Sequence, residues 1–79
     1  MAKHDHDKIR LLAVAKILNE GRRVKVGDIL RRLELQYDIQ ADRKTIYSDV
    51  YAINRFIPID AIPGKNGGYQ KCDFLREGV

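Results

Sequence analysis

Between residues 42 and 56, polar, basic and aromatic side chains recur at helical spacing. Four of them, at i, i+4, i+7 and i+11, share one face: Lys44, Ser48, Tyr51 and Arg55. The opposite face is apolar and carries Ile46, Val50 and Ile53, and Asp42 precedes it as a good N-cap residue. Lysine, arginine, serine and tyrosine bind phosphates and base edges, and the major groove of DNA admits one helix. The pattern predicts a helix that presents this stripe to double-stranded DNA.

Three more candidates flank the stripe near the start of the helix: Arg43, Thr45 and Tyr47. Arg43 and Lys44 stand at the positive end of the helix dipole, where a cation is unfavourable. Phosphate groups would neutralise both charges, so we expect them to contact DNA. For Tyr47, packing within the protein is an equal alternative. Asp49 lies at the edge of the apolar face, which predicts a structural hydrogen bond or ion pair instead of DNA contact.

A β-hairpin is predicted after this helix, with strands over 57–62 and 69–74 and a two-residue turn at Asn66-Gly67. Lys65 and Asn66 at its tip are expected to reach a flanking phosphate or the minor groove. Lys25 is a further phosphate candidate, for which a solvated surface charge is an equal alternative.

The earlier part of the chain predicts the elements that support this face. Apolar periodicity indicates a helix over 7–20 and a second over 27–35, with a short strand over 22–26 and a connection over 37–41. The order of elements is that of a winged helix-turn-helix, an α+β, mainly α fold of three helices plus a C-terminal β-hairpin wing. We expect this domain over 8–74, a flexible N-terminus over 1–7 and a short tail over 75–79.

Composition limits the function. The 79 residues make one small domain, with 15 Lys and Arg against 11 Asp and Glu and a net charge of +4, which suits a nucleic-acid partner. No apolar run approaches the roughly 20 residues that span a membrane. The single cysteine, Cys72, has no zinc ligand set around it, and His4 and His6 lack a preorganised cage. We therefore expect a cytoplasmic protein that is not an enzyme and needs no metal or cofactor.

Two segments also carry a resemblance. Residues 42–50, Asp-Arg-Lys-Thr-Ile-Tyr-Ser-Asp-Val, and 64–69, Gly-Lys-Asn-Gly-Gly-Tyr, resemble the N-terminal winged helix-turn-helix domain of DeoR-type and WYL-domain transcriptional regulators. The resemblance implies sequence-specific DNA binding in a bacterial or phage-like regulator, with the third helix in the major groove. Ser48 departs from the family, which often has arginine there. The C-terminal effector domain of such regulators has no counterpart in this chain, which is either an excised domain or a short relative.

Two questions stay open at this point. A winged-helix module that docks a protein, without reading DNA, is the alternative function. The broad apolar arc of the first helix, with Ile9, Leu12 and Ile17, offers a possible self-contact. We expect a monomer or weak homodimer in solution and paired copies on DNA.

Overall fold

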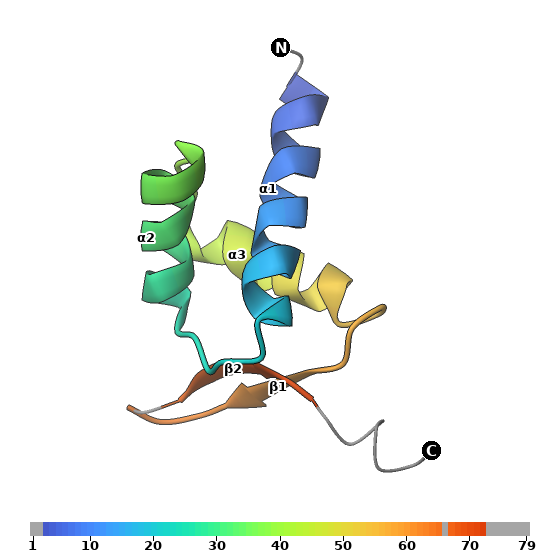
Figure 1. Cartoon of the computed structure of the whole chain (residues 1–79), viewed down its shortest axis with the longest axis vertical. Coiled ribbons are helices and arrows are strands. Elements are labelled where there is room, and N and C mark those ends of the chain that lie inside the picture. Colours follow the sequence, from blue (N-terminus) through green and yellow to red (C-terminus); the bar gives the residue numbers. More distant parts are fainter. Residues whose placement is uncertain (1–2, 66, 73–79) are drawn as a thin grey trace.

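The computed structural model describes residues 3–65 and 67–72. Three helices are followed by an antiparallel hairpin: α1 (Lys3–Asn19), α2 (Val26–Tyr37), α3 (Arg43–Ile53), β1 (Ile59–Ile62) and β2 (Gly68–Lys71). The hairpin lies across the foot of the helices, beneath the end of α1 and the start of α2 (Figure 1). The fold is mainly helical α+β in a winged helix-turn-helix layout, as the sequence predicts.

Apolar side chains from all three helices form one core. The largest fully buried ones are Val14, Ile17 and Leu18 of α1, Ile29 and Leu33 of α2, and Ile46 of α3. Val50 and Ile53 are also buried, which confirms the predicted apolar face of α3. Burial of one such side chain stabilises the fold by about 1.5–3 kcal/mol. The core therefore fixes which side of α3 faces outward.

The first helix differs from its prediction in two ways. It begins at Lys3 instead of residue 7, so Asp7 lies inside it, where it accepts a hydrogen bond from Arg10. Ile17 is fully buried, so the prediction that it contributes to a self-contact is wrong. Because α1 packs against both α2 and α3, its buried arc is wider than a single stripe. Ile9 and Leu12 remain exposed.

The second helix extends beyond the predicted 27–35 at both ends. At its start, the backbone N–H of Lys25 donates to the carboxylate of Asp28 at 3.2 Å. At its end, Asp38 adopts a left-handed conformation with a φ of 56°, and the N–H of Ile39 donates to the carbonyl of Leu33 at 3.0 Å. The left-handed residue that ends a helix is usually glycine. An aspartate ends the helix here, so the sequence lacked the usual stop signal.

The predicted strand over 22–26 is reduced to a single bridge between Val24 and Tyr69. The N–H of Val24 donates to the carbonyl of Tyr69 at 2.8 Å, and the N–H of Tyr69 donates back at 2.7 Å. Val26 already belongs to α2, which leaves no room for a longer strand. The bridge holds β2 against the connection between α1 and α2.

The predicted two-residue turn at Asn66-Gly67 is wrong. Ile62 pairs with Gly68, so the five residues 63–67 connect the strands, and Asn66 itself lies outside the described residues. Pro63 has no N–H to continue the ladder. Gly68 has a φ of 139°, and a Cβ atom there would collide with the backbone of Val24. Glycine at 68 therefore permits the close approach of the two segments. The predicted end of the second strand, Phe74, also lies outside the described residues.

An ion pair joins α1 to α3. The Nε and Nη2 atoms of Arg10 donate to Asp49 at 2.7 and 3.1 Å, and Nη1 donates to Asp7 at 2.9 Å. The side chain of Asp49 is 7% exposed and that of Arg10 is 19% exposed. The hydrogen bond to Asp49 raises the pKa of Arg10, so the guanidinium stays charged. The predicted structural role of Asp49 is confirmed.

Removing this guanidinium should destabilise the fold. Arg10→Met keeps much of the side-chain stem but leaves the carboxylate of Asp49 buried without its partner. We expect a loss of about 3 kcal/mol in the free energy of unfolding, measured by urea titration. Asp7→Ala, which removes only the exposed partner, should cost less than about 1 kcal/mol. Equal losses in the two variants would contradict this assignment.

Candidate nucleic-acid interface

The start of α3 is fixed by its N-cap. The Oδ1 atom of Asp42 accepts a hydrogen bond from the N–H of Thr45 at 2.8 Å, as the sequence predicts. Hydrogen bonds from the side chain and from the backbone N–H of Thr45 lower the pKa of Asp42. The carboxylate also offsets the unfavourable position of Arg43 and Lys44 at the positive end of the helix dipole. The two cations can therefore stand at the start of α3 without fraying it.

All four residues of the predicted outward stripe are exposed, and three of them lie on α3. Lys44, Ser48 and Tyr51 are all exposed on α3. Arg55 is exposed too, but it lies in the turn after the helix, because α3 ends at Ile53 instead of near residue 56. The Oδ1 atom of Asn54 accepts from the N–H of Ile59 at 2.7 Å, and this contact accompanies the turn of the chain into β1.

The three residues that flank the stripe differ in their exposure to solvent. Arg43 is exposed and Thr45 is half-buried. Tyr47 is 48% exposed and lines an apolar groove between α3 and the hairpin, together with Val26 and Tyr69. Burial and the nearby Tyr47 raise the pKa of Tyr69, so its hydroxyl is neutral at physiological pH. Tyr47 therefore both packs toward the hairpin and presents part of its ring to solvent.

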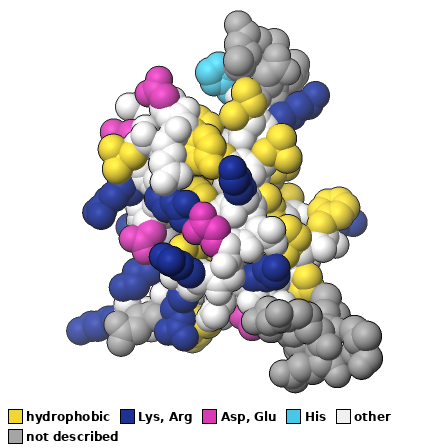
Figure 2. All heavy atoms as spheres, in the orientation of Figure 1, with side chains coloured by type: hydrophobic (Ala, Val, Ile, Leu, Met, Phe, Trp, Pro, Cys, Tyr) yellow, Lys and Arg dark blue, Asp and Glu magenta, His cyan; other side chains and the backbone are white. Residues whose placement is uncertain are grey.

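Lysine and arginine side chains gather over the start of α2 and the hairpin (Figure 2). An open hollow of about 360 Å³ lies there, between the starts of α2 and α3 and the loop of the hairpin. Its lining is Lys25, Val26, Gly27, Asp28, Arg31, Arg43, Gly64, Gly67 and Gly68. Three of these residues are cations and one is an anion. Among the described residues, none of the three cations forms an ion pair with a carboxylate.

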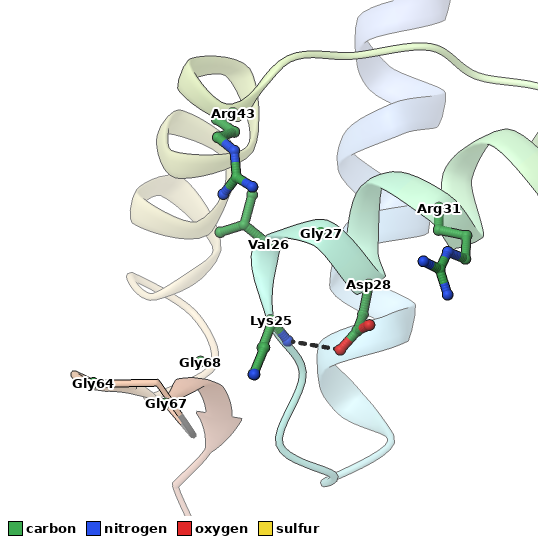
Figure 3. A pocket seen from close by; sticks show the side chains of 9 residues that line it. All are labelled: Lys25, Val26, Gly27, Asp28, Arg31, Arg43, Gly64, Gly67 and Gly68. Atoms are coloured by element: carbon green, nitrogen blue, oxygen red, sulfur yellow. Dashed lines mark hydrogen bonds between the residues drawn. The ribbon is translucent and has the colours of Figure 1, made fainter.

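The cations come from three different segments. Arg43 points from α3 toward Val26 at the beginning of α2, while Lys25 precedes α2 and Arg31 lies one turn into it (Figure 3). The one carboxylate, Asp28, accepts the backbone N–H of Lys25. On the side of the hairpin, the described lining consists of Gly64, Gly67 and Gly68. The hollow is thus a cationic site with room for an anionic group.

Lys25 and Arg43 were predicted as site residues, and the structure brings them together at this hollow. Lys65 is exposed in the hairpin loop next to Gly64, which lines the hollow. Arg31 also lines the hollow but was not among the predicted site residues. The sequence feature that could have indicated it is its place on the polar face of α2, opposite the buried Ile29.

No protein family, curated protein or solved structure matches this chain. Across residues 3–65 and 67–72, no helix is long and apolar enough to cross a membrane. Among the side chains that the structure describes, those of residues 6–65 and 67–72, no three of metal-ligating type lie together.

The cap of α3 should make stability depend on acid pH. The folded pKa of Asp42 is lowered, so its contribution is complete above the unfolded pKa of about 3.9 and is lost as the pH falls through the folded value. Asp42→Asn keeps a capping oxygen but does not titrate. We expect the wild type to lose more free energy of unfolding than this variant between about pH 5 and pH 2. If the free energy of unfolding falls equally in the wild type and in Asp42→Asn over this pH range, protonation of Asp42 does not weaken the cap.

Proposed function

We propose that this protein binds double-stranded DNA sequence-specifically in transcriptional regulation, with α3 in the major groove and the hairpin on the flanking backbone or minor groove. The observation that carries the proposal is the hollow, where Lys25, Arg31 and Arg43 converge without a carboxylate partner. The resemblance of residues 42–50 and 64–69 to DeoR-type and WYL-domain regulators supports the same function. The proposal includes no catalysis and no cofactor.

A backbone phosphate is the ligand that suits the hollow. Its oxygens accept hydrogen bonds from lysine and arginine, and the start of α2 adds the positive end of a helix dipole. Gly67 and Gly68 carry no side chain that would hold a sugar-phosphate chain away. Because Arg43 is also the first residue of α3, a phosphate bound here would set how deeply α3 enters the groove.

The exposed face of α3 supplies the groups that would distinguish bases. The serine hydroxyl of Ser48 donates and accepts hydrogen bonds, and the exposed ring of Tyr51 offers an apolar surface and a hydroxyl. With 11 residues, α3 is about 16 Å long and reads only a few base pairs. A short reading surface limits selectivity, so we expect two copies on each regulatory site.

Neutralising the hollow should weaken binding to every DNA sequence. We expect Lys25→Gln, Arg31→Gln and Arg43→Gln each to reduce the slope of log affinity against log salt by about 0.9, the value for one phosphate contact. Lys8→Gln in α1 makes the same change of charge away from the hollow and should leave the slope unchanged. Fluorescence anisotropy with labelled duplexes over a series of salt concentrations measures both quantities. Unchanged slopes in all three variants would remove the hollow from the interface.

Substitutions on the stripe should instead change sequence preference. A selection from a random duplex library gives the preferred site of the wild type, and the same selection is then repeated with Ser48→Ala and Tyr51→Ala. Each variant should lose about 1–3 kcal/mol of discrimination at particular base pairs and keep the others. Glu34→Ala, on the exposed side of α2, is the control. If the wild type enriches no duplex, the protein-docking alternative is favoured over DNA binding.

A further inference from the structure

A second surface lies where α1 meets the end of α3. A groove of about 180 Å³ is lined there by apolar residues alone, among them Leu11, Leu12, Ala15, Ile53 and Phe56. We call it the α1–α3 groove. Figure 2 shows hydrophobic side chains gathered on this side of the molecule, with lysine and arginine side chains beside them.

Two large side chains at this groove are unusually open to solvent. Leu12 is 70% exposed and Phe56 is 87% exposed. Single exposed hydrophobic residues are ordinary on a protein surface. Here, however, the two flank one apolar groove, and this combination is typical of a surface that binds another molecule.

The rim of the groove is basic. On α1, Lys8 and Lys16 stand four residues before and four residues after Leu12, which places them on the same face of the helix. Arg55 directly precedes Phe56. In the described part of the chain, none of these three cations forms an ion pair with a carboxylate.

Two acidic side chains that the structure describes near this rim, those of Asp7 and Glu20, already have other partners. Asp7 accepts from Arg10 at 2.9 Å, and Glu20 accepts two hydrogen bonds from Arg32 at 2.8 and 2.6 Å. The hydrogen bond to Arg32 lowers the pKa of Glu20, as an established ion pair does. The positive charge at the rim of the groove is therefore not balanced locally by these two groups.

The apolar lining and the basic rim of the α1–α3 groove indicate what kind of molecule binds there. A second copy of the chain would bring the same cations face to face, on molecules that each carry a net charge of +4. An amphipathic helix whose apolar stripe is flanked by Asp and Glu satisfies both the groove and its rim. We propose that the α1–α3 groove docks an acidic amphipathic helix of a partner protein.

This surface is separate from the one proposed for DNA. Its lining shares no residue with the hollow or with the stripe residues Lys44, Ser48 and Tyr51. Only Arg55, at the rim, belongs to both sets of candidates. Apart from Arg55, the two proposals rest on different side chains and are tested independently.

A display library of amphipathic helices tests the proposal. The apolar stripe is held constant, and the flanking positions are varied among Glu, Gln and Lys. Selection on the wild-type chain should enrich Glu at the flanks. Enrichment of Lys or Gln, or no enrichment above a bare support, would overturn the proposal.

The enriched peptide then maps the surface by fluorescence anisotropy. Leu12→Ser and Phe56→Ser should each weaken binding by roughly tenfold or more, a loss typical of a central apolar contact, and Lys16→Glu should weaken it as well. Leu35→Ser is the matched control, since Leu35 is 75% exposed on α2, outside the groove. Circular dichroism verifies that each variant is folded.

Three results would overturn the assignment. One is an equal loss of peptide affinity in Leu35→Ser and Phe56→Ser. Another is self-association of the wild type that Phe56→Ser abolishes, because the occupant would then be a second copy. The third is loss of DNA affinity in Leu12→Ser, which would place the groove in the DNA interface. A failure of DNA binding in the wild type, by contrast, leaves this proposal unaffected.

Discussion

Two backbone hydrogen bonds between Val24 and Tyr69, 2.8 and 2.7 Å long, hold the hairpin beside the start of α2. They require the chain to pass so close at residue 68 that only glycine fits. Side-chain hydrogen bonds from Gln70 to the carbonyl of Gly21 and from Lys71 to Asn19 add to this contact. The glycines of the hairpin thereby line the cationic hollow together with Lys25 and Arg43. The geometry of the hollow therefore depends on contacts between segments 45 residues apart, with the bridge between Val24 and Tyr69 at their centre.

The position of α3 rests on different forces. Its buried face joins the common core, and Asp49 binds Arg10 of α1 through two hydrogen bonds. Burial is non-directional, whereas the paired hydrogen bonds are directional and oppose rotation or sliding of α3 against α1. The Asp42 cap fixes where the helix begins. Together these contacts keep the cations at the start of α3 in a constant relation to the hollow.

The features that could be predicted from the sequence are those that depend on residues close together in the chain. The apolar face of α3, its cap at Asp42 and the structural role of Asp49 follow from helical spacing and capping chemistry within a few residues. The missed features depend on long-range contacts. The five-residue hairpin loop follows from the pairing of Ile62 with Gly68, and the burial of Ile17 follows from packing against two helices. The cationic hollow joins residues from three segments, so the place of Arg31 on the polar face of α2 could not by itself show that it lines the hollow.

We propose that the hollow and the exposed face of α3 form one DNA-binding surface. A titration of the isotopically labelled protein with a selected DNA duplex, monitored by NMR chemical-shift changes of the backbone amides, tests this most directly. We expect the largest changes at Val26, Gly27 and Gly67 around the hollow and at Lys44 and Ser48 on α3. Amides near Leu12 in the α1–α3 groove should change little. Changes confined to that groove, with none around the hollow, would show that the hollow does not contact DNA.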